Sequence, residues 1–569
     1  MSMVNIVQLL TEHMDIWTAA DTEKKSGRGR ASGNAGNVYG IKKLRELILE
    51  LAVRGKLVSQ DRNDEPASEL LKCIQAERAK LIAEGKLKKE KPLTPIGEDE
   101  KLFELPKGWD WKRLPETYYS ISPRGNQLKG SEIKEEGKFP VVDQGQTFIS
   151  GYTDNQDLLI EIPHPLIVFG DHTTNLKLID FDFVAGADGT KLLAPILIYP
   201  KFYFYYLNSY KLENRGYARH FKVLNDNLIA IPPIAEQHRI VAKVDELMAL
   251  CDQLEQQHTN AQEAHETLVS QLLATLGQSQ NVAEFKANWQ RIYAHFDVLF
   301  NTDASIDALK QTLLQLAVMG KLVPQDPNDE PARELVKRIQ AEKAKLIAEG
   351  KLKKEKQLAL ISEDEKPYET PTGWTWVRLN ELLTKIGAGS TPLGGKQVYV
   401  QEGVPFLRSQ NVWDDGLRLD DVAFITPDTH KKMSGTHVYS GDLLFNITGA
   451  SIGRCAIVPD DFLTGNVSQH VTIIRLVSTQ LLRFMHLVLI SQHVQQTVMD
   501  VQVGVSREGL SIGKLGQFVI PIPPLSEQYR IVAKVNVLMA LCDQLKTRIQ
   551  QANQQQQAIA NALVEQVVA

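Results

Sequence analysis

At 569 residues the chain exceeds the size of a single hydrophobic core, so several domains are expected. Its apolar content of 43% and charged content of 23% are those of a soluble globular protein, and no apolar run approaches the roughly 18 to 20 residues that span a bilayer. Because its start also lacks the basic and then apolar run of a signal peptide, we expect a cytoplasmic protein. A net charge of -5 argues against a nonspecific nucleic-acid coat but leaves local basic surfaces open.

Two blocks of the sequence occur twice. Residues 51–91 return as residues 316–356 with 34 of 41 positions identical, and residues 231–254 return as residues 522–545 with 19 of 24 identical. Agreement at this level indicates a tandem duplication, which decides how every other element is interpreted.

The segments between the repeated blocks differ from each other. Residues 112–229, the first insert, and residues 377–520, the second insert, share no visible sequence. A duplicated frame with unlike inserts suits a molecule that docks two like partners and recognises two unlike targets.

The first 104 residues predict a repeated helical region that contains a pair of short helices. Apolar residues at spacings of three and four line each helix. The helices end at Gly55 and Gly85, a residue type suited to the left-handed position after a helix. The same pieces recur in the second copy, where they end at Gly320 and Gly350.

The inserts have a different pattern, with short apolar and β-branched runs between Gly, Asp and Asn turns. Such runs are typical of buried strands in compact domains that mix helices and strands. They occupy residues 139–142, 166–169, 443–447 and 471–474.

Each second repeated block starts a long helix after a proline pair. Apolar residues alternate at spacings of four and three, which predicts a heptad seam that packs against another helix. The first of these helices should run from about Glu236 to Leu276. The seam residues are Ile240, Val244, Leu247 and Leu254 in the first copy and Ile531, Val535, Leu538 and Leu545 in the second.

Basic and amide side chains gather in the predicted loops of both inserts. Arg, Lys, Asn and Gln are the types that pair with base edges and phosphates, so these loops are candidate DNA contacts. The candidates are Arg124, Lys129, His172, Lys177, Lys191, Arg215 and Arg219 in the first insert, and Arg408, Gln410, Asn411, Arg454, Gln469, His470 and Arg507 in the second.

Ordered motifs around the inserts resemble a known family. Each insert is entered through a proline, glycine and paired-tryptophan motif, Leu-Pro-Lys-Gly-Trp-Asp-Trp at 105–111 and Thr-Pro-Thr-Gly-Trp-Thr-Trp at 370–376. Each is left through Ile-Pro-Pro followed by Glu-Gln, at 231–237 and 522–528. The second insert adds Gly-Ser-Thr-Pro at 389–392, which the first lacks. Because these motifs occur in this order twice, the chain resembles the specificity subunit of a type I restriction-modification system. The strong similarity between its two copies is like that of the type IB subgroup.

This resemblance implies a mixed α/β (α+β) fold with two globular target recognition domains separated by long antiparallel coiled-coil helices, in a tandem pseudo-twofold duplication. The implied organisation is an N-terminal helical region (1–104), recognition domains at 105–233 and 370–524, a central helical spacer at 234–369 and a C-terminal helix at 525–569.

The resemblance also implies partners. Each domain would read one half of a bipartite target in double-stranded DNA, while the helices set the gap between the halves and dock two modification (methyltransferase) subunits. Restriction subunits would join this assembly. S-adenosylmethionine, ATP and Mg are expected on those partners, with no cofactor bound by this chain.

Missing motifs argue against catalysis by the chain itself. The sequence has no Asn-Pro-Pro-Tyr or Asp-Pro-Pro-Tyr motif, no phosphate loop and no Cys/His cluster with zinc spacing. A fused restriction enzyme would need methyltransferase and nuclease domains, for which no residues remain. A coiled-coil adaptor for two protein partners fits the helices equally well but leaves the loop chemistry unexplained.

Overall fold

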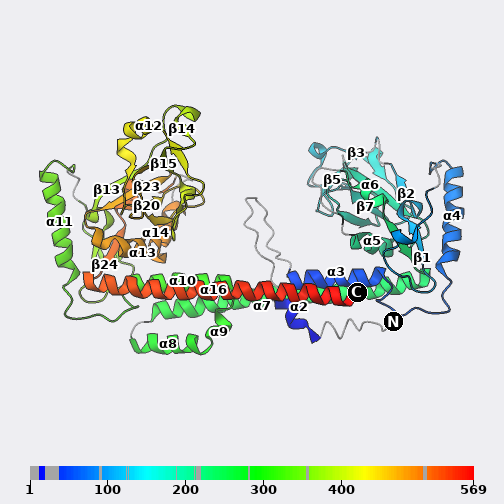
Figure 1. Ribbon diagram of the computed structural model, residues 1–569, viewed down its shortest axis with the longest axis horizontal. Helices are drawn as coiled ribbons and strands as arrows, with labels where there is room; N and C mark the ends of the chain where they lie inside the picture. The colour runs from blue at the N-terminus through cyan, green and yellow to red at the C-terminus, as the bar shows by residue number, and fades with distance from the viewer. Residues whose placement is uncertain are drawn as a thin grey trace. The chain divides into compact units, whose positions relative to one another are not determined.

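The computed structural model describes residues 12–19, 38–88, 93–122, 125, 127–186, 189–210, 212, 219–279, 282–353, 358–503 and 509–568. The chain divides into two compact units, one made of Met1–Gln262 with Gln551–Ala569 and the other of Glu263–Gln550. Two long helices, α7 (Ile234–Gln278) and α16 (Leu525–Val568), each contribute residues to both units (Figure 1). No helix in the described ranges is long and apolar enough to cross a membrane.

The first unit holds the helices α2 (Met14–Ala19), α3 (Tyr39–Val53) and α4 (Ala67–Ala83). Helix α3 packs in one core with the beginning of α7 and the end of α16, to which α7 contributes Leu247 and α16 contributes Ala560. Arg45 on α3 pairs with both Asp252 (2.6 Å) and Glu255 (2.8 Å) on α7. The end of the chain therefore belongs to the same bundle as its beginning.

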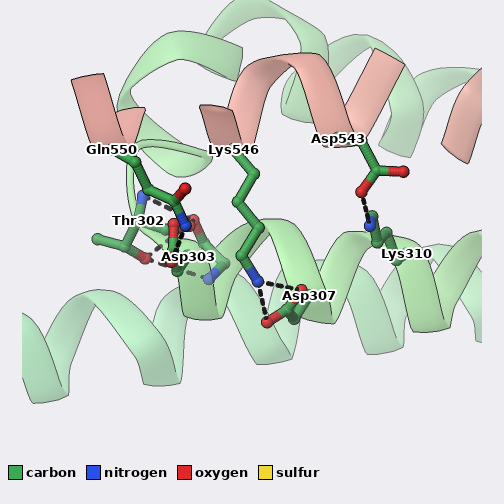
Figure 2. A network of polar contacts seen from close by, with 8 residues as sticks. Thr302, Asp303, Asp307, Lys310, Asp543, Lys546 and Gln550 are labelled. Atoms are coloured by element: carbon green, nitrogen blue, oxygen red, sulfur yellow. Dashed lines mark hydrogen bonds and ion pairs between the residues drawn. The ribbon is translucent and has the colours of Figure 1, made fainter. Parts of the chain in front are cut away.

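The second unit repeats this arrangement with α10 (Asp303–Val318) and α11 (Ala332–Ala348), preceded by α8 (Val282–Ala294) and α9 (Phe296–Leu299). Here α10 packs with the beginning of α16 and the end of α7. Figure 2 shows the polar side of the α10–α16 contact, where Lys310 pairs with Asp543 and Lys546 lies 2.8 Å from Asp307. The Lys310–Asp543 pair occupies the repeat positions of Arg45 and Asp252.

The predicted seam lies inside these bundles. Ile240, Val244, Leu247 and Leu254 are buried in the core of the first unit, and Ile531 and Val535 are buried in the second. Leu538 and Leu545 are half-buried against the core that contains α10. The heptad pattern is thus confirmed as a packing seam. Helix α7 begins two residues before the predicted Glu236 and ends two residues after Leu276.

The short helices end where the sequence predicts, and the structure gives a reason for the terminal glycines. Gly55 has φ +66° and Gly320 has φ +72°. A Cβ at Gly55 would lie 2.5 Å from Cγ of Pro106, and one at Gly320 would lie 2.5 Å from Cγ of Pro371. Both the backbone angle and the close approach of the entry motif therefore require glycine.

The first insert forms two sheets. One is antiparallel with the strand order β2-β10-β7-β8, and the other has the order β3-β9-β4-β5 with β6 also paired to β9. Strands β3 and β4 run parallel to β9. The pair β1-β11 joins the two ends of the insert. The bounds are β1 (Asp110–Arg113), β2 (Tyr118–Ile121), β3 (Gln127–Leu128), β4 (Phe139–Val142), β5 (Gly151–Thr153), β6 (Leu159–Ile160), β7 (Leu166–Gly170), β8 (Leu176–Ile179), β9 (Phe183–Gly186), β10 (Thr190–Pro195), α5 (Pro200–Ser209), α6 (Phe221–Asn225) and β11 (Leu228–Ile231).

The second insert also forms two main sheets, with the strand orders β13-β23-β20-β21 and β14-β18-β15-β22-β19. Strand β15 runs parallel to β22, and the pair β12-β24 joins the ends of the insert. The bounds are β12 (Thr375–Arg378), β13 (Leu383–Ala388), β14 (Tyr399–Val400), β15 (Val404–Leu407), β16 (Val412–Trp413), β17 (Gly416–Leu417), β18 (Ala423–Ile425), α12 (Pro427–Lys432), β19 (His437–Val438), β20 (Leu443–Asn446), β21 (Cys455–Ile457), β22 (Gly465–Val467), β23 (Val471–Leu476), α13 (Leu482–Ile490), α14 (Gln492–Val503), α15 (Ile512–Gly516) and β24 (Val519–Ile522).

The two inserts share one antiparallel sheet order and one parallel strand pair although they share no visible sequence. In each, a four-stranded antiparallel sheet has the same chain order, and a parallel strand pair, β4 with β9 or β15 with β22, forms the centre of the other sheet. The segments differ after the first strand of that pair. Residues 143–150 of the first insert contain no strand, whereas the second insert places the β16-β17 hairpin there.

Candidate nucleic-acid interface

The candidate residues of the second insert gather where several strands begin or end at one edge of the sheets. Backbone hydrogen bonds join these loops: Ser468 N donates to Leu407 O (2.9 Å), Ile447 N to His470 O (3.0 Å) and Gly389 N to Val471 O (3.0 Å). The edge therefore collects the loops that follow β13, β15, β20 and β22. These loops carry Arg408, Gln410, Asn411, Arg454, Gln469 and His470.

Arg408 and Gln410 lie together on the loop after β15. Nη2 of Arg408 donates to the backbone oxygen of Asp421 (3.0 Å), and Nε2 of Gln410 donates to the Asp421 carboxylate (2.6 Å). Because the Asp421 carboxylate is mostly exposed, DNA can compete with it for these donors. Both residues are suitably placed to contact DNA.

Asn411 has a structural position. It is buried, its Oδ1 accepts from the backbone N–H of Arg408 (2.9 Å), and its Nδ2 donates to the backbone oxygen of Arg418 (2.9 Å). The amide is thus used within the loop, and the sequence-based assignment of Asn411 as a base contact is not supported by its burial.

Gln469 and His470 are exposed on the loop between β22 and β23. The Thr448 hydroxyl lies 2.6 Å from Nδ1 of His470, and the Thr391 hydroxyl donates to Oε1 of Gln469. Thr391 belongs to the Gly-Ser-Thr-Pro motif after β13. These hydrogen bonds make one polar surface out of loops that follow three different strands.

The equivalent edge of the first insert lies where β4 and β7 end and β10 begins. Gln144, just after β4, binds the turn after β7: its backbone oxygen accepts from the Thr173 hydroxyl (2.6 Å) and from Nδ2 of Asn175 (3.0 Å). The backbone N–H of His172 donates to Oε1 of Gln144 (3.2 Å). His172 therefore sits on a turn that is anchored to the neighbouring sheet.

Lys177 is a correction to the sequence-based list. Its side chain is only 5% exposed, and Nζ donates to the backbone oxygens of Asp143 (2.8 Å) and Thr147 (2.6 Å). Burial lowers the pKa of this ammonium, while the Asp143 carboxylate 3.6 Å away favours its charge. Lys177 fastens β8 to the 143–147 loop and is not available to DNA in this conformation.

Other candidates in the first insert remain at the surface. Lys191 is the second residue of β10, with Nζ 3.8 Å from the Asp171 carboxylate and 5.6 Å from the centre of the Phe221 ring. Lys129 and Arg219 are exposed on loops after β3 and before α6. Arg124, Arg215 and Arg507 lie outside the described residues.

The structure adds residues that sequence reasoning missed. Trp413 and Arg418 come from the β16-β17 hairpin, and the ring of Trp413 lies 3.7 Å from the guanidinium carbon of Arg454. The Trp-Asp-Asp-Gly-Leu run at 413–417 contains the Asp-Gly signal of a tight hairpin and could have identified this element. In the first insert the missed residue is Gln144, whose role depends on contacts between distant loops.

Comparison with known proteins identifies the family. The family model described as the type I restriction modification DNA specificity domain matches residues 106–263 and 371–554. The specificity subunit of the Escherichia coli type I restriction enzyme EcoAI is 38% identical over 603 aligned positions, which cover 99% of this chain and all of that protein. That of EcoEI, also from Escherichia coli, is 37% identical over 601 positions, covering 98% of this chain and 99% of that protein.

A crystal structure of the HsdS subunit from Thermoanaerobacter tengcongensis is 16% identical, with a TM-score of 0.31, and the match covers 82% of this chain and 98% of that one. The assignment rests on the sequence matches, which extend over both inserts and both copies of the repeated blocks. The chain belongs to the family of type I restriction-modification DNA specificity subunits.

Proposed function

We propose that each insert reads one half of a bipartite sequence in double-stranded DNA, and that the helices fix the number of unread base pairs between the halves. The observation that carries this proposal is that a shared antiparallel sheet and a shared parallel strand pair present two different sets of loop residues. A rigid sheet scaffold presents loops at one edge, and function resides in loops that such a scaffold positions. Two equivalent edges with unlike side chains are suited to two unlike half-sites.

The residues at each edge are donors for nucleic acid. Arg408, Gln410, Gln469 and His470 supply charged and neutral groups in the second insert, and Lys129, His172, Lys191 and Arg219 supply them in the first. Phosphate contacts position a protein on the duplex, and contacts to base edges specify the sequence. The mixture of exposed lysines with loop-bound amides and arginines serves both purposes.

The duplicated helices support the proposed partners. Because α3 with α7 and α10 with α16 form equivalent bundles, two copies of a modification subunit can dock in the same way on a single asymmetric chain. We further propose that restriction subunits join this assembly in the cytoplasm. S-adenosylmethionine, ATP and Mg are assigned to those partner subunits.

Replacement of one insert tests the proposal. Exchanging residues 112–229 for the corresponding insert of another family member should change one half of the methylated sequence and leave the other half and the gap unchanged. Modification-sensitive sequencing of DNA from cells that carry the complete system provides the readout. The reciprocal exchange of residues 377–520 is the matched control and should change the other half. A change of both halves by either exchange, or no dependence of methylation on either insert, would contradict independent reading; the second result would favour a protein adaptor.

A further inference from the structure

The β16-β17 hairpin is a part of the second insert that has no counterpart in residues 143–150 of the first. The hairpin follows the loop that contains Arg408 and Gln410, and two hydrogen bonds fix its position. Nε1 of Trp413 donates to the backbone oxygen of Gln410 (2.8 Å), and the backbone N–H of Cys455 donates to the Asp414 carboxylate (2.9 Å). The hairpin is therefore fastened to β21, immediately beside Arg454.

Trp413 is held between two arginines. The guanidinium carbons of Arg418 and Arg454 each lie 3.7 Å from the centre of its ring. Two groups this close to the centre of one ring cannot occupy the same face, so the guanidinium groups lie on opposite faces of the indole. Stacking of this kind is favourable because the ring face is electron-rich, and tryptophan is the best aromatic partner for a cation.

The stack orients the arginines but does not use their hydrogen-bond donors. A guanidinium group directs its N–H bonds within its own plane, so a group that lies flat on a ring keeps those edges available. Within the described part of the chain, the side chain of Arg454 forms no hydrogen bond or ion pair. Among the residues that the structure describes, the Arg418 side chain has one ion-pair partner, the exposed Asp415 carboxylate at 3.4 Å. Apart from the electrostatic attraction between Arg454 and the Asp414 carboxylate, the remaining donors have no partner among the described residues.

The surrounding charge favours a base edge over a phosphate as the acceptor. Arg408, Arg418 and Arg454 share this corner with the carboxylates of Asp414, Asp415 and Asp421. These carboxylates offset the charge of the three arginines, which weakens attraction to the DNA backbone. A neutral acceptor pair, such as O6 and N7 of guanine, still accepts two hydrogen bonds from one arginine.

We infer that Trp413 is a positioning residue for base recognition: it holds Arg454, and with it Arg418, so that Arg454 donates to a guanine in the half-site read by the second insert. Trp413 itself does not touch DNA. This inference rests on the proposed function, because it requires the second insert to be a DNA reader.

The experiment uses the complete chain assembled with its modification subunit. Duplexes that carry the methylated sequence are changed one base pair at a time, and binding of W413L, W413F and R454A is measured against each. For W413L and R454A, discrimination at one guanine position of the second half-site should fall by about five- to 150-fold, the range of a bidentate arginine contact. W413F keeps an aromatic face and should retain most of the discrimination at that guanine position. Discrimination within the first half-site should not change.

Two further measurements separate positioning from general damage. In a double-mutant cycle, W413L and R454A should be strongly non-additive, because both remove the same contact. The dependence of binding on salt should keep its slope in each variant, whereas loss of a phosphate contact would lower that slope by about one.

Tyr439→Leu is the matched control. The Tyr439 ring also has an arginine over it, since the Arg475 guanidinium carbon lies 4.7 Å from the centre of the ring. Tyr439, however, precedes β20, whereas the loop that leads to Arg454 follows β20. This variant should discriminate the bases of both half-sites as the unchanged chain does.

The inference is overturned if W413L and R454A discriminate every base of the second half-site normally, or if their effects add. It is also overturned if both variants lose affinity for specific and scrambled DNA alike, with a lower salt slope. The proposed function fails separately if neither half-site is discriminated by the unchanged complex.

Discussion

At the scale of single residues, the two copies share a buried anchor between the entry motif of each insert and its exit helix. Nε1 of Trp109 donates to Glu236 (2.9 Å), as does Nε2 of Gln60 (3.1 Å). The second copy repeats both contacts on Glu527, from Trp374 at 3.0 Å and Gln325 at 3.1 Å. In the sequence this anchor is visible only as a repeated motif, because the spacing of apolar residues does not indicate that the glutamate carboxylate is buried.

The anchor predicts a pH dependence. Burial raises the pKa of Glu236 and Glu527 above the ordinary value of a glutamate, while the tryptophan and glutamine donors oppose this shift. A carboxyl with a raised folded-state pKa contributes stability below the unfolded value, near 4.3, and loses it as pH rises through the folded value. The stability of E236Q relative to the unchanged chain should therefore increase between about pH 4 and neutrality. Denaturant unfolding across this range provides the measurement, and a constant difference would contradict the assignment.

Lys177 gives a second prediction at this scale. Because its ammonium holds two backbone carbonyl groups inside the first insert, K177A should destabilise the folded chain by about 1 to 3 kcal/mol and leave the methylated bases unchanged. Thermal unfolding and sequencing of the methylated DNA distinguish the two effects. K191A, which removes a partly exposed lysine, is the control for stability. If K177A relaxed the sequence without loss of stability, Lys177 would be a DNA contact after all.

At the scale of elements, local patterns in the sequence predict much of the fold. The predicted strands at 139–142 and 166–169 correspond to β4 and β7, and the glycines at 55, 85, 320 and 350 follow helices as expected. The strand order could not be predicted, because β15 and β22 pair in parallel across more than fifty residues, and tertiary packing decides such pairing. For the same reason, the burial of Asn411 and Lys177 was not visible from residue type.

The contact between α10 and α16 contains both a buried seam and exposed ion pairs, and the seam should dominate. Leu313 is 5% exposed in the core that contains Cys542, so L313A should cost about 2 to 5 kcal/mol through lost burial and a residual cavity. The Lys546–Asp307 pair is partly exposed, so K546A should cost less than about 1 kcal/mol. Unfolding midpoints of the two variants at low and high salt provide the comparison. A larger loss for K546A would show that the ion pairs hold these helices together.

At the scale of the whole molecule, α7 and α16 each continue without a break through residues of both units. A flexible tether between two readers would tolerate several gaps between half-sites, whereas continuous helices should permit one. The duplication and the seam follow from the repeated blocks. The bases of each half-site do not, because they depend on loop geometry and on the deformation of DNA.

One measurement tests this account most directly: the methylated sequence produced by a chain with seven residues added to α7 near Gln262 and seven to α16 near Gln550. Seven residues preserve the heptad phase and lengthen each helix by about 10 Å at ~1.5 Å per residue. At ~3.4 Å per base pair this corresponds to roughly three additional unread pairs. We expect both half-sites to keep their bases while the gap grows to a single longer value. Continued methylation at the original gap would contradict the claim that the helices set the distance between two independent readers.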